Sequence, residues 1–477
     1  MDSILKSERN VKYLKISSVY QTCAESESIL KLRAVFKLFG KNLIGLKFFD
    51  CVFMSMDFVR MLRKALNIKQ FELGNMACLD PKAVKRSLAK GKKKFKKLEK
   101  FNNLESLSIN YCDERILLKT YMMLKKNMLL DVSIGGPFRP VYIDYLVDNQ
   151  STLKKLTVAD TNLNSTINLM NHKEFTAFHI KAPCFYVCKP QDISDFLNNH
   201  PKLTSLDLES TEITFEILQE ICKMSQLEKL KINIEKLCAE DMKQLESLSS
   251  LREFAIINHS SFLSRHQFEA FTEIRNLKLT KFEMEQGSSS KETDLIRFAH
   301  NNPSLEYISI PCISKRVTEV FFEQCKMLKV FNCPGMYQAP CAYSNTTFSS
   351  EKIDNMYSTH LVELDSPYFK PCNILYKNFP NLKKFKWYPF VIPSDEDFNV
   401  MLMQLKNIEH LEIMRSEKIT KDSLESVKNH GRNLSYIKFN NLSKYLFWSD
   451  TEIDKYFEAH PQPIVVEEKI IRIVNYT

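Results

Sequence analysis

Short hydrophobic runs with a fixed internal spacing recur along the whole chain, and one stretch shows the pattern most clearly. Residues 192–197 place hydrophobic side chains at helical spacing. Pro201 then ends the helix, because proline has no N–H and the residue before it avoids the helical region. Leu203, Leu206 and Leu208 follow in the order L-x-x-L-x-L. The pattern predicts a helix, a stop and a short strand, a unit whose apolar side only a stacked neighbour can cover.

The same six-residue frame, with Ile, Val or Phe also allowed, occurs seventeen times. Its starts run from residue 11 to residue 434, so the mean step is about 26 residues, which is typical of leucine-rich repeats. We therefore expect an α/β leucine-rich-repeat solenoid, a horseshoe with a parallel concave sheet, convex helices and about seventeen irregular repeats. The frames begin at Val11, Leu43, Ile68, Leu104, Leu129, Leu153, Phe175, Leu203, Leu227, Leu251, Ile274, Leu305, Leu328, Leu361, Leu382, Ile408 and Leu434.

The repeats extend over the whole chain, so residues 1–477 are expected to form a single leucine-rich-repeat domain. A solenoid escapes the usual size limit of a globular core, because each unit packs only on its neighbours. Three segments lack the pattern: a basic insertion at 81–100 and loop insertions at 286–291 and 334–350. Near the end of the chain, the hydrophobic run at 470–474 predicts a closing edge strand. Insertions of this kind form loops on one face of a solenoid, often the binding face.

The ninth position of the frame indicates how neighbouring repeats are held together. Leucine-rich repeats place Asn or Cys there. We expect a small side chain at this turn to hydrogen-bond backbone groups of the adjacent repeat. In four copies the position is occupied by Cys51, Cys112, Thr161 and Thr211.

Composition and motifs give no support for catalysis. Only 9 glycines occur, about 2% against a usual ~7%, which leaves few residues for a phosphate-binding loop. The motifs of nucleotide-binding loops, zinc peptidases and serine hydrolases are absent from the sequence. We therefore predict that the protein is not an enzyme and needs no cofactor.

Cysteines and histidines in suggestive places have structural explanations. The cysteine pairs lack the spacing of a zinc site, so we expect no metal and assign them to the core or to turns. Four histidines lie near predicted helix C-termini, where a partial positive charge meets the helix dipole. We expect these to cap helices rather than to catalyse. The residues concerned are Cys184, Cys188, Cys333, Cys341, His200, His300, His430 and His460.

Targeting features indicate a protein of the cytoplasm, the nucleus or both. Residues 1–10 contain no apolar segment of a secretory signal peptide. No run reaches the ~18 apolar residues of a membrane helix, so no membrane contact is expected. The 13 cysteines are scattered and odd in number, which favours reduced thiols.

Candidate binding residues occupy the frame positions between the leucines. Alternate residues of a strand point to opposite faces, so these side chains are expected on the open concave face, as are Lys47, Ser108, Lys231, Asn233 and Ser309. Aromatic residues contribute disproportionately to binding energy, which favours the C-terminal third as the contact surface. The alternative is that they are ordinary solvated strand residues. The proposed contacts are Tyr307, Lys383, Lys384, Lys386, Tyr388, Glu412, Tyr436 and Lys438.

The basic insertion carries almost all of the net charge. Residues 82–100 hold ten Lys or Arg and one acid, so they contribute +9 of the net +10. A solvated loop or helix extension explains the run, and so does a nuclear-import signal or a nucleic-acid-binding patch. Its densest part is Lys92, Lys93, Lys94, Lys96 and Lys97.

One stretch resembles a known protein family. Residues 36–51, FKLFGKNLIGLKFFDC, resemble the first repeat after the F-box in F-box/leucine-rich-repeat (ribonuclease-inhibitor-like) proteins, particularly those of insects. The Asn-His-Pro-x-Leu run at 199–203 supports the likeness. The resemblance implies that the repeats hold a substrate, while an F-box of ~40 residues binds the adaptor of a cullin ubiquitin ligase. The ten residues before Val11 do not contain an F-box, so either one lies upstream or the protein recognises without recruiting.

Together these observations predict a non-catalytic protein-protein interaction module. Its partner is another protein of unknown identity, and cullin-ligase subunits join if an F-box exists upstream. The most favoured role is the substrate-recognition array of an F-box-like ubiquitin-ligase receptor. The alternatives are a ubiquitin-independent leucine-rich-repeat scaffold or inhibitor, and a nuclear nucleic-acid-associated protein that uses the basic insertion.

Overall fold

The computed structural model divides into two compact units, residues 1–227 and 228–477, and each is described by itself. The division lies within the frame that begins at Leu227, just before β11. The single domain over 1–477 stays a prediction. The structure describes residues 11–20, 27–79, 100–136, 140–159, 172, 174–181, 190–257, 265–275, 277–284, 291–311, 313–333, 358–366, 378–387, 394–413, 418, 420, 422–431, 433–434, 436–439, 464–467 and 470–473.

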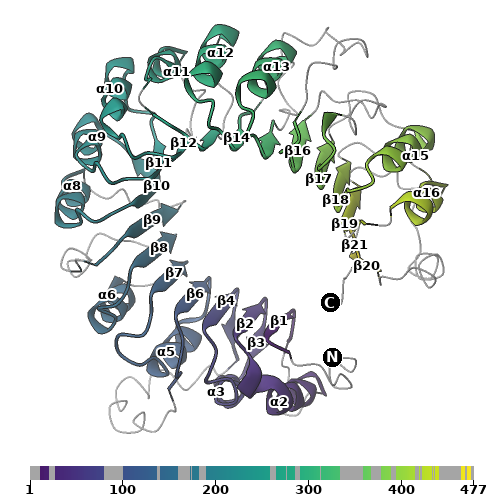
Figure 1. The fold of residues 1–477 in the computed structure, drawn as a ribbon. Helices are drawn as coiled ribbons and strands as arrows, with labels where there is room; N and C mark the ends of the chain where they lie inside the picture. Colours follow the sequence, from purple (N-terminus) through teal and green to yellow (C-terminus); the bar gives the residue numbers. More distant parts are fainter. Residues whose placement is uncertain are drawn as a thin grey trace. The chain divides into compact units, whose positions relative to one another are not determined.

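The first unit is a parallel sheet with helices along one of its faces (Figure 1). Its sheet strands are β1 (Tyr13–Ser17), β2 (Gly45–Phe49), β4 (Gln70–Gly74), β6 (Ser106–Asn110), β7 (Asp131–Gly135), β8 (Lys155–Ala159), β9 (Ala177–Lys181) and β10 (Ser205–Glu212). Its helices are α2 (Glu27–Phe39), α3 (Ser55–Leu62), α5 (Glu114–Met122), α6 (Pro140–Asn149), α8 (Pro190–Asn199) and α9 (Phe215–Cys222). A small parallel pair, β3 (Val52–Phe53) and β5 (Ala77–Cys78), links two of the turns.

The second unit repeats this arrangement and ends in an antiparallel hairpin. Its parallel strands are β11 (Lys229–Asn233), β12 (Glu253–Ile257), β13 (Lys281–Met284), β14 (Tyr307–Ser309), β15 (Val330–Asn332), β16 (Glu363–Ser366), β17 (Lys384–Trp387), β18 (His410–Ile413) and β19 (Tyr436–Phe439). Its helices are α10 (Ala239–Lys243), α11 (Arg265–Thr272), α12 (Glu292–Asn301), α13 (Lys315–Gln324), α15 (Asp395–Gln404) and α16 (Asp422–His430). The hairpin strands are β20 (Ile464–Glu467) and β21 (Ile470–Ile473).

The frame leucines form the core, which confirms the predicted α/β leucine-rich-repeat fold. Leu203, Leu206 and Leu208 are at most 1% exposed, and burial of each such side chain contributes about 1.5–3 kcal/mol. Among the described residues, sixteen of the seventeen predicted frames begin two residues before a strand.

The eleventh frame was placed wrongly. We predicted that it begins at Ile274, but β13 begins at Lys281, so the true frame starts at Leu279. Phe282 and Met284 fill its inward positions and are buried, and the Phe282 ring centroid lies 4.6 Å from that of Phe298 on α12. The leucine spacing at 274–279 is misleading because an aromatic residue and a methionine replace the expected leucines.

The C-terminal strand also differs from its prediction. Residues 470–474 were expected to form a closing edge strand. Instead β21 pairs antiparallel with β19 on one side and with β20 on the other. The edge of the described sheet is therefore β20, because the chain folds back on itself once more than the hydrophobic pattern indicated.

The turns after the strands continue the hydrogen bonding between repeats. The N–H of Asp50 donates to the carbonyl of Gly74 at 3.0 Å, and the N–H of Tyr111 donates to that of Gly135 at 2.7 Å. The turn residue adopts positive φ, a conformation in which the chain can reverse at once. Five strands of the first unit are followed by such a residue: Ser18, Asp50, Asn75, Tyr111 and Gly136.

The predicted role of the ninth position is confirmed at Cys51. Its thiol donates to the Phe49 carbonyl at 3.0 Å and lies 3.8 Å from the carbonyl oxygen of Ile16 in the preceding repeat. The Cys112 thiol lies 3.4 Å from the Asn110 carbonyl of its own repeat. Burial raises the pKa of Cys112 to about 12. Thr211 is buried, and the prediction for Thr161 falls outside the described residues.

Buried polar side chains three residues before the frame also join adjacent repeats. Gln150, 1% exposed, accepts the N–H groups of Met128 and Leu129 at 2.9 and 3.0 Å and donates to the Lys125 carbonyl at 2.7 Å. His200 follows the same rule, because its Nε2 lies 2.6 Å from the carbonyl oxygen of His172. These contacts satisfy backbone groups that the loops would otherwise bury without partners.

Two of the histidines show the predicted contact at a helix C-terminus. Nδ1 of His200 lies 2.6 Å from the Phe196 carbonyl oxygen, and Nδ1 of His300 lies 2.7 Å from that of Ile296. His430 ends α16, and His460 falls outside the described residues. The capping explanation is therefore confirmed for His200 and His300.

Because Gln150 holds backbone groups of the preceding repeat, its replacement by an apolar residue of similar volume should lower the stability of the fold strongly. Gln150→Leu leaves two N–H groups and one carbonyl without partners, and each buried orphan costs ~1–3 kcal/mol. We expect the free energy of unfolding in urea to fall by ~2–4 kcal/mol. Gln70→Leu, the same change at an exposed site, is the control and should stay within ~0.5 kcal/mol. Equal effects of the two substitutions would contradict the assignment.

Candidate functional site

The uncovered face of each sheet carries two rows of side chains. The third and fifth frame residues of successive strands point away from the helices, because inward and outward side chains alternate. The register keeps each row aligned, since Lys47 pairs opposite Glu72 and Lys386 opposite Glu412. Side chains at the same frame position in neighbouring repeats therefore lie side by side.

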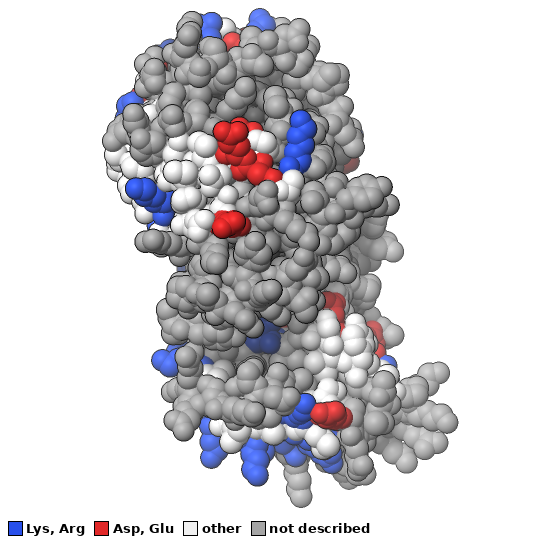
Figure 2. Space-filling view, turned by 90° about the vertical axis from the view of Figure 1, so that its right-hand side faces the viewer, with Lys and Arg blue, Asp and Glu red and all other residues white. Residues whose placement is uncertain are grey.

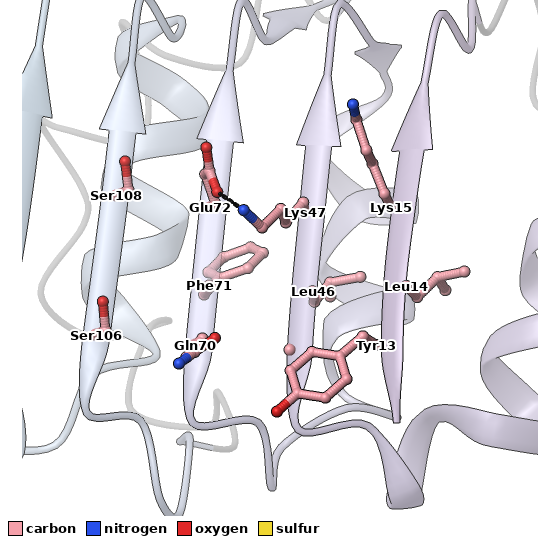
Figure 3. A pocket seen from close by; sticks show the side chains of 11 residues that line it. Tyr13, Leu14, Lys15, Leu46, Lys47, Gln70, Phe71, Glu72, Ser106 and Ser108 are labelled. Atoms are coloured by element: carbon pink, nitrogen blue, oxygen red, sulfur yellow. Dashed lines mark ion pairs between the residues drawn. The ribbon is translucent and has the colours of Figure 1, made fainter. Parts of the chain in front are cut away.

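In the first unit this face is hollowed over its first four strands (Figure 3). The hollow has a volume of about 540 Å³ and spans β1, β2, β4 and β6. Such a volume falls within the range of ligand-binding clefts. The polar side chains that line it are Tyr13, Lys15, Lys47, Gln70, Glu72, Ser106 and Ser108.

A glycine makes room for the aromatic side chain at one end of the hollow. The Tyr13 ring lies against Gly45 on the neighbouring strand, where a Cβ atom would sit 2.5 Å from the Tyr13 Cδ1 atom. Tyr13 is nevertheless 64% exposed. The ring thus presents one surface to the sheet and the other to solvent.

The charges of the hollow are only partly balanced. Lys47 and Glu72 form an ion pair of 2.6 Å between adjacent strands, which Figure 3 marks. The Lys15 ammonium lies 5.5 Å from the centroid of the Phe49 ring, a weak cation–π contact. One lysine therefore remains without a carboxylate among the described residues of the lining.

Among the predicted contact residues of the C-terminal third, Lys384, Lys386 and Glu412 occupy the open rows, Lys383 directly precedes β17, and all four form ion pairs. Lys383 forms an ion pair with Glu409 at 2.7 Å, and Lys384 forms one with Glu363 at 3.3 Å. Lys386 lies between two carboxylates, 3.9 Å from Asp365 and 3.8 Å from Glu412. Surface pairs of this kind contribute ~0–1 kcal/mol each. They set the pattern of charge on the face more than its stability.

The aromatic residues of this group also have neighbours across the strands. The Lys281 ammonium lies 4.7 Å from the centroid of the Tyr307 ring, and the Tyr436 and His410 rings stack at 5.6 Å. Both tyrosines are partly exposed, as is Lys438. The prediction for Tyr388 falls outside the described residues, as do those for Lys92, Lys93, Lys94, Lys96 and Lys97.

One residue expected on the open face is buried. Asn233 is 3% exposed, because its side-chain oxygen accepts the N–H of Glu235 at 3.1 Å. It belongs to the turn at the end of β11 rather than to the open rows. The alternation rule fails there because the chain leaves the strand geometry.

A buried carboxyl on the open face has an unusual environment. Asp365 is 8% exposed, and its Oδ1 atom has no hydrogen-bond partner among the described residues. Asn332 lies opposite it in the register, and its Oδ1 atom also lacks a partner there. Burial raises the pKa of Asp365 to about 7, while the ammonium of Lys386 opposes this shift.

Acidic side chains also occur away from the open face, on the side of the molecule where α15 and α16 lie. Figure 2 shows acidic side chains gathered in a small group there. The first turn of α15 contains Asp395, Glu396 and Asp397. Two of these have internal partners, because Asp395 accepts the Thr420 N–H at 2.7 Å and Asp397 accepts the Ser394 N–H at 3.0 Å. Helix capping accounts for Asp397, and a hydrogen bond to the backbone of a later segment accounts for Asp395.

The sequence analysis missed the residues at the N-terminal end of the hollow. Tyr13 occupies the third position of the first frame, the position of Tyr307 and Tyr436 in their own frames. The same rule applied to the first four repeats would also have found Lys15, Gln70 and Ser106. These residues carry a weaker signal in the sequence than Lys383, Lys384 and Lys386, because they are spread over separate repeats.

The described residues contain no group of three or more His, Cys, Asp or Glu side chains placed to hold a metal ion. In the same part of the chain, no helix combines the length and apolar character that a membrane span requires.

The repeat geometry defines a leucine-rich-repeat fold. No family model matches the chain, and no curated protein matches its sequence. Among solved structures it is similar to that of a TLR13–ssRNA13 complex, with 13% identity, a TM-score of 0.39, and coverage of 93% of this chain and 55% of the other.

Two further solved structures show the same distant likeness of fold. For Rad7 in the yeast Rad7–Elc1 complex, identity is 13%, the TM-score is 0.38, and the match covers 57% of this chain and 77% of the other. For the leucine-rich-repeat protein LegL7 of Legionella pneumophila, identity is 10% and the TM-score is 0.35. That match covers 65% of this chain and 98% of the other. The chain spans about half the length of the TLR13 match.

The environment of Asp365 predicts a pH dependence of stability. The folded pKa, about 7, lies above the unfolded value of ~3.9. Between these values the folded chain binds the extra proton, so this group makes stability fall as pH rises from about 4 to 7. Asp365→Asn should therefore stabilise the chain increasingly through that window, as urea unfolding at pH 5 and pH 7.5 would measure.

The magnitude and the control follow from the same linkage. The gain is limited to about 1.4 kcal/mol per pH unit. Asp131→Asn, on an exposed ion pair with Lys155, should change stability by less than ~0.5 kcal/mol. A difference between Asp365→Asn and the native chain that shrinks with rising pH would contradict the assignment.

Proposed function

We propose that the chain is a non-catalytic module that holds a partner protein on the open face of its sheet. The observation that carries this proposal is the contrast between the two faces of each unit. Helices cover one face (Figure 1). The other face presents rows of side chains that are mostly exposed or half-exposed, many of them polar or aromatic. Rows of charge in fixed register suit recognition of one partner over others, because complementary charge gives specificity more than affinity.

The more specific role that we propose is substrate recognition in a ubiquitin-ligase receptor of the F-box-like kind. Its support is the resemblance of residues 36–51 to the first repeat after an F-box. In this role the protein acts in the cytoplasm, the nucleus or both. The ubiquitin-independent alternative, a scaffold or inhibitor, uses the same face and differs only in what else the complex contains.

Aromatic residues on the open face provide the test of binding. Tyr307→Ala combined with Tyr436→Ala should weaken capture of the partner about tenfold or more, because exposed tyrosines often dominate interface energy. The measurement is affinity purification of the full chain from cell extract with quantitative mass spectrometry. Met403→Ala removes a side chain that is 49% exposed on α15 and is the matched control. Equal loss with the control would overturn the proposal.

The same purification tests the ligase role separately. Cullin-ligase subunits should co-purify with the full chain and should remain when the two tyrosines are replaced, because the adaptor binds elsewhere. Their repeated absence, with the partner still captured, would remove the ligase role and favour the scaffold or inhibitor.

A second function is favoured by the basic insertion alone. Ten basic residues against one acid in 82–100 suit contact with phosphates, whose binding weakens steeply with salt. Replacing Lys92, Lys93 and Lys94 by Gln should abolish binding to a single-stranded RNA or a duplex DNA probe at low salt. RNA or DNA binding that persists in the variant would exclude this role for the insertion.

A further inference from the structure

We propose that the hollow over β1, β2, β4 and β6 binds an extended acidic segment of the partner protein. In this assignment a carboxylate of the segment pairs with Lys15, and an adjacent apolar or aromatic side chain packs on Tyr13. The inference rests on the proposed function and deepens it, because it names the chemistry that one part of the open face recognises.

Four of the seven polar side chains that line the hollow have no polar partner among the described residues. The Tyr13 hydroxyl, the Lys15 ammonium, the Gln70 amide and the Ser106 hydroxyl make no hydrogen bond or ion pair with any residue that the structure describes. The polar groups of the C-terminal third are instead largely paired with one another. Binding there must break existing pairs, whereas binding in the hollow can form new ones.

The balance of charge determines the sign of the ligand. Glu72, the carboxylate of the lining, is already paired with Lys47 at 2.6 Å. Lys15 remains without a carboxylate, and the neighbouring Lys12 is also exposed. The hollow therefore has an excess of positive charge at its β1 end. A cationic segment would be repelled there, and an anionic one is attracted.

The exposed tyrosine adds an apolar requirement. Tyr13 is 64% exposed and is held against Gly45, so its outer surface is available and its orientation is restricted. Tyrosines of this kind bind at low conformational cost, because few rotatable bonds become ordered. A free phosphate or a carboxylate alone would leave this surface uncovered, which favours a peptide over a small anion.

The spacing of the strands gives the length of the segment. Neighbouring strands lie ~4.8 Å apart, so three spacings from β1 to β6 span ~14 Å. An extended peptide rises ~3.3 Å per residue, which corresponds to about four or five residues lying across the strands. Gln70 and Ser106 then lie along its path and can hydrogen-bond its backbone (Figure 3).

The test uses the full chain and two fluorescein-labelled heptapeptides, EEYEELE and its basic counterpart KKYKKLK, in fluorescence anisotropy. The acidic peptide should bind and the basic one should not. Lys15→Glu should weaken binding of the acidic peptide at least tenfold, and Tyr13→Ala should do so about tenfold, while Tyr13→Phe retains most of it. Lys37→Glu, an exposed lysine on α2, should leave the affinity unchanged.

Several outcomes would overturn the assignment. No binding of the acidic peptide, equal binding of both peptides, or equal loss with Lys15→Glu and Lys37→Glu would each contradict it. The chain could instead bind a single-stranded RNA probe and neither peptide, and Lys15→Glu could abolish that binding. The ligand of the hollow would then be a nucleic acid and not a protein segment. A further outcome is that the Lys15→Glu variant still captures the partner protein that the Tyr307 and Tyr436 substitutions release. In that case the assignment of the hollow is wrong, while the proposed function stands.

Discussion

The structure depends on one constraint: a single repeat has too little apolar surface to fold alone, so each strand must pair with the next in parallel and share its core. The frame leucines, such as Leu206 at 1% exposure, provide the buried side of that arrangement. Parallel pairing satisfies the backbone within the strands. Turn residues such as Asp50 and buried side chains such as Gln150 continue the hydrogen bonding where the strands end.

This constraint also explains why one face of the sheet is available for binding. Helices bury the inward side chains, so most residues at the third and fifth frame positions lie outside the core and can vary with the partner. The lysines on the open face differ in their partners between the two units. Lys386 lies between two carboxylates of neighbouring strands, whereas Lys15 faces the hollow without one. We infer that the unpaired polar groups of the hollow mark a recognition site.

Much of the fold was predictable from the sequence, because leucine spacing reports burial directly. The error at Ile274 shows the limit of that signal: Phe282 and Met284 serve the core equally well but do not match the leucine pattern. The open face was predictable only as rows. Which lysine pairs with which carboxylate depends on the register between strands. The place of the Tyr13 ring in the hollow depends on Gly45, whose missing side chain carries no hydrophobic signal. The binding residues of the C-terminal third remain predictions.

We propose that the open face, and not the helical face, meets the partner. A photo-crosslinking amino acid placed at single positions of the full chain in cells tests this most directly. The open positions Gln70, Glu283 and Ser309 are compared with the helical positions Lys37, Thr293 and Met403. We expect a partner to be captured from the open positions while the helical ones stay silent. Capture from the helical positions alone would show that the helical face, and not the open face, meets the partner.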